Sequence, residues 1–338
     1  MIHQVRLVNF KSHRDTTIDL GPLTVLVGAN ASGKTSILRG LYIAAETARH
    51  GRDHGASLLS SSFATSRLCR EGHSEFQIFV TGEEAGDGPW SVETSFRIEP
   101  TGWAPRRFMV DGKRPQLGEA QRITTRGATL ARLSPDRIRS HSPVAGTLNR
   151  EFDGANIASQ LARLRLKNDS AFERIQVDMR LVVPSFDSVV LEAVEEKEGS
   201  GYALKLNFDG VSEIAATDAS DGTLLALAVL TLVHSPNPPG VVLFDDIELG
   251  LHPTAQLTLM RLLERIATNG SKVQFVATAH SPYILSAIDP RYVYVTAIKD
   301  GISHVKSLSQ HPLAVKRLQV LDAGEFWSSE DESWVLAP

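Results

Sequence analysis

The chain has 338 residues, enough for one large domain or two modest ones with a sizeable core. Hydrophobic content of 42% and charged content of 22% are ordinary for a globular protein, and the net charge of −4 provides no overall attraction to nucleic acid or an anionic membrane. Cys69 is the only cysteine, which excludes an internal disulfide framework and fits a reducing, cytoplasmic compartment.

The first elements surround a glycine-rich motif. Residues 1–7 alternate like a strand and lack the basic segment and apolar core of a signal peptide. An apolar strand is expected at 23–27 and a helix from 34 to about 50, with G-A-N-A-S-G-K-T at 28–35 between them. Strand, loop and helix are the context of a G-x-x-x-x-G-K-T phosphate loop. Residues 51–62 are small and polar, and are expected to form a loop or a frayed helix end.

The phosphate loop predicts a nucleotide site, against the alternative of a glycine-rich turn without a ligand. Its two glycines let the backbone turn tightly, and the amides at the start of the helix point at the anion. Lys34 would reach the β and γ phosphates, and the Thr35 hydroxyl would bind Mg²⁺, which prefers oxygen ligands. The residues expected to bind ATP are Gly28, Asn30, Ala31, Ser32, Gly33, Lys34, Thr35 and Ser36.

The middle of the chain is less regular and strongly basic. Further strands are expected at 76–80, 90–98, 189–194 and 202–208, a hairpin with an Asp111-Gly112 turn at 107–114, and a helix at 157–166. Residues 102–150 contain ten Lys and Arg but only three acids, a local charge of +7. This segment is either a solvated face balanced by acids elsewhere or a surface for DNA, RNA or an acidic partner.

From residue 221 onward helices and strands alternate, with strands at 241–244 and 272–277 and a helix at 254–268. Such alternation predicts a largely parallel sheet with helices on its faces. The longest apolar run, 224–233, is too short to cross a bilayer and is expected to be a buried helix, so no membrane association is predicted. Acids and aromatic residues mix in 325–338, which should dock on another surface or on the chain's own domain.

Two motifs at strand ends carry candidate chemistry. The strand at 241–244 ends in two acids, of which Asp245 would hold the Mg²⁺ shell and Asp246 would orient or activate the attacking water. Acids often end strands at solvent, so this pair alone is a weak signal. His280 follows the next strand, at the sheet edge where ligands bind. It would contact the γ-phosphate or the water, or merely cap the next helix.

A third motif precedes the apolar helix, where Ser220, Asp221 and Gly222 stand in sequence. Ser220 or Asp221 would make an ordinary N-cap. In the functional interpretation, the serine hydroxyl and the amides at the helix start form a second anion-binding end, which meets a γ-phosphate presented by another subunit.

In order and spacing these motifs resemble those of the ABC-type ATPase heads of SMC, RecF-like and OLD-type proteins. The opening V-N-F-K-S-H at 8–13 and D-D-I-E-L-G-L-H-P at 245–253 are also similar to family segments. The resemblance implies an α/β P-loop NTPase of ABC-ATPase type: a mixed sheet with helices on both faces, an antiparallel β portion and a helical insertion. It divides the chain into a first ATPase lobe at 1–100, a basic, partly helical insertion at 101–180 and a second lobe at 181–338.

The chain departs from the family pattern at several points. Asp246 stands where the family usually has glutamate, so its carboxylate reaches one methylene less far. No glutamine is placed for the family's Q-loop, whose turn could correspond to 135–139. No long coiled coil is expected, nor the Toprim nuclease domain that OLD proteins carry after the position of His280.

The function implied by the resemblance is an ATPase that uses ATP and Mg²⁺ and forms a homodimer or higher homo-oligomer around ATP. A small ATPase of this kind would regulate a separate effector protein, a nuclease or toxin in bacterial anti-phage defence. Two alternatives stay open: a DNA-repair or DNA-clamping factor, and a nucleotide-gated scaffold with negligible turnover.

Overall fold

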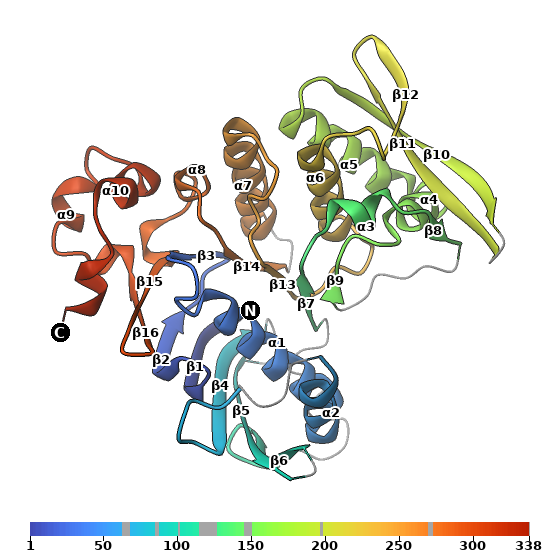
Figure 1. The fold of residues 1–338 in the computed structure, drawn as a ribbon. Coiled ribbons are helices and arrows are strands. Elements are labelled where there is room, and N and C mark those ends of the chain that lie inside the picture. The colour runs from blue at the N-terminus through green and yellow to red at the C-terminus, as the bar shows by residue number, and fades with distance from the viewer. Residues whose placement is uncertain are drawn as a thin grey trace.

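The computed structural model describes residues 1–62, 68–84, 88–100, 102–114, 127–144, 151–196, 199–269 and 273–337, which form three sheets flanked by helices (Figure 1). The strands are β1 Ile2–Phe10, β2 His13–Asp19, β3 Leu23–Gly28, β4 Glu75–Glu84, β5 Gly88–Glu99, β6 Gly102–Val110, β7 Ala128–Ala131, β8 Ser142–Pro143, β9 Glu151–Phe152, β10 Phe186–Glu196, β11 Gly199–Phe208, β12 Val211–Ala215, β13 Val241–Phe244, β14 Gln274–Thr278, β15 Val293–Lys299 and β16 Ile302–Ser307. The α-helices are α1 Lys34–His50, α2 Arg52–Ser62, α3 Pro135–Arg139, α4 Ile157–Lys167, α5 Asp169–Val182, α6 Asp221–Val233, α7 Pro253–Thr268, α8 Pro282–Leu285, α9 Ala314–Arg317 and α10 Ala323–Ser329.

The central sheet has the order β16-β15-β3-β14-β13-β7-β9 and is parallel except for the β15–β16 pair. Its strands are apolar on both faces, and successive residues enter different cores: Val242 packs with α6 and α7, whereas Leu243 packs with α1. Helices cover both faces, as parallel sheets require. The carboxyl ends of β3, β13 and β14 therefore meet at one edge, which brings the phosphate loop beside the acids and the histidine.

Two antiparallel sheets complete the fold. The first, β2-β1-β4-β5-β6, shares with the central sheet the core around α1. The second, β10-β11-β12 with β8, packs against α4 and α5 (Figure 1). This arrangement confirms the predicted mixed sheet with helices on both faces and an antiparallel β portion.

The structure corrects two local expectations. Residues 52–62 form α2 instead of a loop, because Leu59 is fully buried and Gly55 approaches Thr47 of α1 so closely that a Cβ would lie 2.3 Å from its Oγ1. This tertiary packing stabilises a helix that a run of small, polar residues would not form by its own propensity. The Asp111-Gly112 turn is confirmed, with both φ angles positive. However, β6 already begins at Gly102 and pairs with β5, so the predicted hairpin is reduced to a single bridge after the turn.

The segment 101–180 contributes more than helices. Strand β7 lies within it and pairs in parallel with β13, on the side of β13 that faces away from β14. Helix α4 confirms the helix predicted at 157–166, and α5 follows directly. Any division of the chain at residue 101 therefore has to assign two strands of the central sheet, β7 and β9, to the middle segment.

Candidate functional site

The phosphate loop joins β3 to α1 and leaves its tip open. Ala29, Asn30 and Ala31 are exposed, whereas the Ser32 carbonyl accepts from Ser303 Oγ at 2.7 Å, which fixes the base of the loop. Gly28 has φ 135°, and a Cβ there would lie 2.1 Å from the Thr296 carbonyl oxygen. Only glycine fits such a position.

Gly33 is the second glycine that the loop needs. It has φ 107°, and a Cβ there would lie 2.4 Å from Ser303 Oγ. Its carbonyl accepts from the Ser36 amide at 2.9 Å, so Ser36 lies in the first turn of α1. Both glycines thus have the positive φ angles that the G-x-x-x-x-G-K-T spacing predicts for a tight loop.

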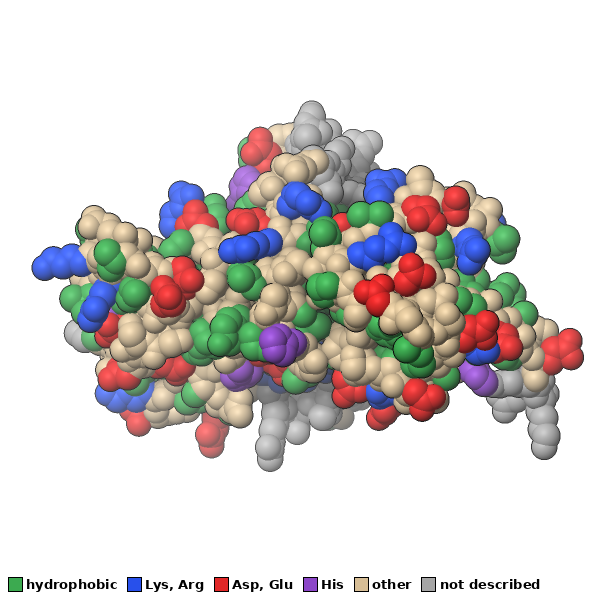
Figure 2. All heavy atoms as spheres, turned by 90° about the horizontal axis from the view of Figure 1, so that it is seen from above, with side chains coloured by type: hydrophobic (Ala, Val, Ile, Leu, Met, Phe, Trp, Pro, Cys, Tyr) green, Lys and Arg blue, Asp and Glu red, His purple; other side chains and the backbone are tan. Residues whose placement is uncertain are grey.

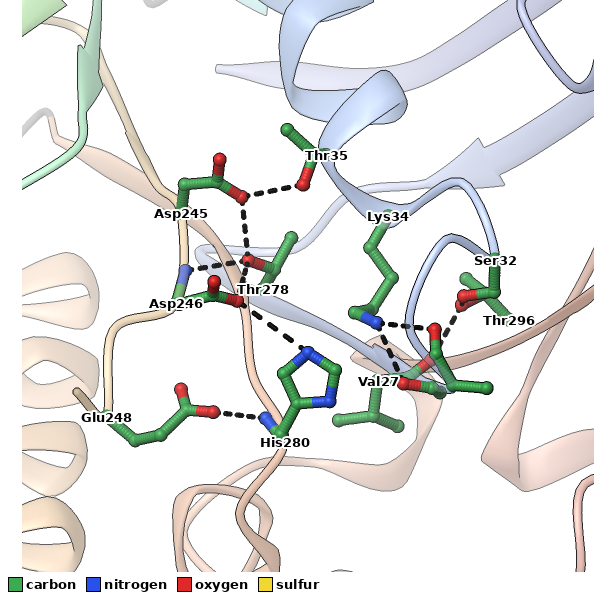
Figure 3. Close-up of polar contacts among 12 residues, drawn as sticks. Val27, Ser32, Lys34, Thr35, Asp245, Asp246, Glu248, Thr278, His280 and Thr296 are labelled. Carbon is green, nitrogen blue, oxygen red and sulfur yellow. Dashed lines mark hydrogen bonds and ion pairs between the residues drawn. The ribbon is translucent and has the colours of Figure 1, made fainter.

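Lys34 is buried with its ammonium folded back onto the loop. Its Nζ donates to the carbonyl oxygens of Gly28 and Ala29 at 2.8 and 2.9 Å (Figure 3). Burial lowers the pKa of Lys34, while the nearby carboxylates, Asp246 foremost, oppose that shift. A desolvated cation beside an open loop favours anion binding.

Thr35 and Asp245 form the oxygen pair predicted for Mg²⁺. Thr35 Oγ1 donates to Asp245 Oδ1 at 2.8 Å, and Thr278 Oγ1 donates to the same oxygen at 3.1 Å (Figure 3). Among the described residues no group of three or more His, Cys, Asp or Glu side chains could hold a metal by itself. The donor set fits a Mg²⁺ ion that also takes phosphate oxygens and water as ligands.

Asp246 and His280 meet one step further along the edge. Asp246 has φ 55°, a left-handed conformation that its amide stabilises by donating to Thr278 Oγ1 at 2.8 Å. Its Oδ1 lies 3.8 Å from His280 Nε2 (Figure 3). Burial and then the charge of Lys34 lower the pKa of His280, so its ring is mainly neutral at pH 7.

Glu248 is a further acid at this edge. One carboxylate oxygen accepts from the His280 amide, while Oε2 is buried and has no hydrogen-bond partner in the described part of the chain. Burial raises the pKa of Glu248. An incompletely satisfied, buried carboxylate at a ligand edge is a candidate proton acceptor.

Ser220, Asp221 and Gly222 begin α6 and are called the α6 start below. Ser220 is its N-cap and accepts from the Thr223 amide at 3.3 Å, as the simpler interpretation expected. A Cβ on Gly222 would lie 2.4 Å from the Gly250 carbonyl oxygen, so the α6 start packs tightly on the loop that follows Asp246. Within the described ranges no hydrogen bond or ion pair joins the α6 start to the phosphate loop of the same chain.

Three site residues were not predicted to act there. Arg132, at the end of β7, places its Nε 3.1 Å from Asp245 Oδ2; its only sequence signal was the charge of the basic segment. Thr278 bridges both acids but stood in the histidine motif without a role. Glu332, from the C-terminal segment, accepts from the Ala29 amide at 3.1 Å.

The basic segment is largely paired with acids where it is described. Arg107, Arg132, Arg137 and Arg139 each form an ion pair, and residues 115–126 and 145–150 lie outside the described ranges. On the face of the molecule in Figure 2, Lys and Arg are interspersed with Asp and Glu. These ion pairs neutralise part of the segment's positive charge, and a surface for nucleic acid or an acidic partner stays a prediction.

His13 is a fully buried histidine behind the loop. Its Nε2 donates to the Gly33 carbonyl, 3.1 Å away, so the neutral ring accepts from Thr16 Oγ1 at Nδ1, 3.0 Å away. Burial lowers the pKa of His13 to about 4. Protonation would remove the Nδ1 acceptor and bury a charge beside the loop.

We expect His13 to make folding pH-dependent. Because the unfolded chain takes up this proton near the ordinary histidine pKa, the free energy of unfolding should fall as pH drops from about 6.5 to about 4, by about 3 kcal/mol in all. Urea unfolding at pH 7.5 and 5.0 should show about 2 kcal/mol less pH dependence in His13→Gln than in the wild type. The exposed His73→Gln variant is the control; equal pH dependence in all three proteins would contradict the assignment.

Comparisons with known proteins identify the family and the fold of the chain. Residues 110–286, more than half of the chain, match the family model described as "AAA domain, putative AbiEii toxin, Type IV TA system", and residues 1–86 match an AAA ATPase domain. None of the described helices is long and apolar enough to span a membrane.

Curated relatives are similar over part of their length. The chain is 28% identical over 140 residues to the retron Ec83 probable ATPase of Escherichia coli, covering 40% of this chain and 25% of that protein. The retron Vc95 probable ATPase of Vibrio cholerae serotype O1 biovar El Tor is 26% identical over 127 residues, 36% of this chain and 24% of that protein. The matches thus span about a quarter of these relatives.

Solved structures show the same fold over nearly the whole chain. The SMC head bound to the C-winged helix domain of ScpA superposes with a TM-score of 0.65 at 16% identity, covering 93% of this chain and 99% of that one. The Pyrococcus furiosus Smc head with an extended coiled coil gives 0.59 at 15% identity, covering 94% and 99%. The chain therefore belongs to the AAA-domain family that matches residues 110–286, and it has the fold of an SMC head.

Proposed function

We propose that the protein binds and hydrolyses ATP with Mg²⁺ and that two copies close around the nucleotide. The observation that carries this proposal is the convergence of Lys34, Thr35, Asp245, Asp246 and His280 at one edge of the sheet (Figure 3). The match to an AAA ATPase domain over residues 1–86, which include the phosphate loop, supports ATP as the nucleotide.

Each side chain would have a distinct task. The Lys34 ammonium would move from the two loop carbonyls to the phosphates, and Thr35 and Asp245 would hold the metal. Bound Mg²⁺ supplies positive charge against the phosphate oxygens. Asp246 would accept the proton of the attacking water, and the neutral ring of His280, 3.8 Å away, would orient that water or the γ-phosphate.

Closure by a second copy would complete the site. The loop tip is exposed, and the α6 start makes no polar contact with its own loop among the described residues. A helix start from a second copy would offer amides and the Ser220 hydroxyl to the γ-phosphate. In a two-fold arrangement both nucleotides would lie in the interface.

The test is the ATP-dependent mass in solution. Asp246→Asn with ATP and Mg²⁺ should accumulate a closed dimer, and adding Ser220→Arg should shift the protein to monomer, because the arginine clashes at both sites. Asn237→Arg, at an exposed position beyond the end of α6, is the matched control. Equal mass, compactness and nucleotide retention with and without Ser220→Arg would refute closure through the α6 start.

The closed state would regulate a separate effector, a nuclease or toxin in anti-phage defence. Supporting this are the relatives named as retron ATPases and the toxin–antitoxin description of the matching family. Co-expressing the chain with the protein encoded beside it, and scoring growth during phage infection, tests the proposal. Protection should require both proteins and vanish with Lys34→Ala; protection by the neighbour alone would exclude control by this ATPase.

Glu332 should weaken ATP binding. Its carboxylate already accepts from the Ala29 amide, and its negative charge acts on both Lys34 and His280. A γ-phosphate arriving there would meet an acid of like charge. Glu332→Gln should therefore tighten ATP binding roughly tenfold and ADP binding less, as measured by calorimetry. Glu325→Gln is the control, because the Glu325 carboxylate accepts a hydrogen bond from the Asp322 amide instead. An unchanged ATP affinity in Glu332→Gln would contradict this prediction.

A further inference from the structure

Arg132 and Asp245 stand side by side because of the sheet register. Strands β7 and β13 are parallel neighbours, with Ala131 opposite Phe244. The Asp245 amide donates to the Ala131 carbonyl at 3.0 Å, so the two strands stay paired to their last residues. Arg132 and Asp245 are the next residues on each strand, and their side chains meet with Nε 3.1 Å from Oδ2.

Both oxygens of the Asp245 carboxylate accept hydrogen bonds from neighbouring side chains. Thr35 and Thr278 donate to Oδ1, and Arg132 donates to Oδ2. The carboxylate is 12% exposed, whereas the Arg132 side chain is 42% exposed and so has room to move. The guanidinium thus supplies the positive charge that a buried carboxylate requires.

A divalent cation at Asp245 would change this balance. Mg²⁺ beside an arginine meets strong repulsion unless phosphate charges arrive with it. The surroundings are already rich in cations, since burial together with the charges of Arg39 and Arg132 lowers the pKa of Lys11 to about 8. A triphosphate brings the negative charge that this cluster lacks.

We propose that Arg132 is a positioning residue that holds Asp245 in place of the metal while the site has no nucleotide, and that it transfers to phosphate oxygens when Mg²⁺ and ATP bind together. This inference rests on the proposed nucleotide function. It makes the metal bind more tightly with nucleotide than without it, since a divalent cation alone has to compete with the guanidinium for Asp245.

The same movement would reach the α6 start. Only residues 133 and 134 separate Arg132 from α3, whose last residue is Arg139. Arg139 contacts the α6 start directly, donating to the Ala219 carbonyl at 3.1 Å and pairing with Asp221 at 2.5 Å. Nucleotide loading would thereby shift the surface that a second copy has to meet.

The test uses Mn²⁺ as a spectroscopic probe of the metal site in the full chain. Binding of Mn²⁺ without nucleotide is followed by electron paramagnetic resonance, and binding of ATP in EDTA by calorimetry. Arg132→Gln should tighten Mn²⁺ binding roughly tenfold and weaken metal-free ATP binding roughly tenfold. The reason is that the lost positive charge of Arg132 repels the metal ion and attracts the phosphates. Arg132→Lys, which keeps the charge, should lie between Arg132→Gln and the wild type.

Arg137→Gln is the matched control, since Arg137 lies in the same segment but pairs with Asp153. It should leave both affinities unchanged. Unchanged Mn²⁺ affinity or unchanged metal-free ATP affinity in Arg132→Gln would overturn the inference. A wild type that binds no ATP even with Mg²⁺ would instead overturn the proposed function, so the two failures are distinguishable.

Discussion

Lys34→Ala should abolish tight ATP binding and leave the fold intact. In the structure the ammonium donates to the carbonyl oxygens of Gly28 and Ala29 within the loop, so alanine removes contacts of the loop itself. With nucleotide bound, the same charge would face the phosphates at close range. Charge-assisted hydrogen bonds of this kind contribute about 3 kcal/mol together, so the affinity should fall roughly 100-fold or more.

Equilibrium binding of ATP by calorimetry measures this loss, and circular dichroism and thermal unfolding report on the fold. Lys299→Ala is the matched control, since it removes the same charge from an exposed lysine on β15. It should bind ATP like the wild type. An ATP affinity that survives Lys34→Ala in a folded protein would mean that the G-x-x-x-x-G-K-T segment is only a turn between β3 and α1.

The phosphate loop and the parallel sheet could be predicted because their determinants are local. The fixed spacing of Gly28, Gly33, Lys34 and Thr35 specifies the loop conformation, and the apolar runs at 23–27 and 241–244 can only be buried strands. The acids and His280 followed from the same logic, since parallel strands carry their ends to a common edge. The resemblance to ABC-type ATPase heads then predicted that these motifs belong to one nucleotide site.

The residues that were missed depend on contacts between distant parts of the chain. Arg132 follows a strand of four residues, too short to stand out in a basic stretch, and its partner Asp245 lies 113 positions away. Glu332 reaches Ala29 across 303 positions. Neither pairing leaves a periodic or compositional trace. The same holds for α2, which depends on burial of Leu59 instead of on its own helix propensity.

Asp246→Asn should slow ATP hydrolysis without weakening ATP binding. The acid lies beside His280 at the edge where the γ-phosphate would sit, and among the described residues no hydrogen bond or ion pair joins it to Lys34 or Thr35. An amide can still orient water but accepts its proton poorly. Loss of a general base costs roughly 100-fold or more in rate, whereas removing a negative charge that acts on Lys34 does not weaken binding of the ATP anion. Single-turnover hydrolysis with preloaded ATP isolates this step.

Glu248→Gln is the decisive companion variant. Glu248 is the other carboxylate with an unoccupied oxygen near His280, and burial raises its pKa toward that of an effective base. If Asp246 is the base, Glu248→Gln should reduce the single-turnover rate less than Asp246→Asn does, by disturbing the His280 amide alone. Asp246→Glu should keep turnover, because it restores the longer reach that is usual at this position in the related ATPase heads. If Asp246→Asn instead hydrolysed ATP at the wild-type rate and Glu248→Gln lost hydrolysis, Glu248 would be the proton acceptor. Asp246 would then be the residue that positions Thr278 and His280.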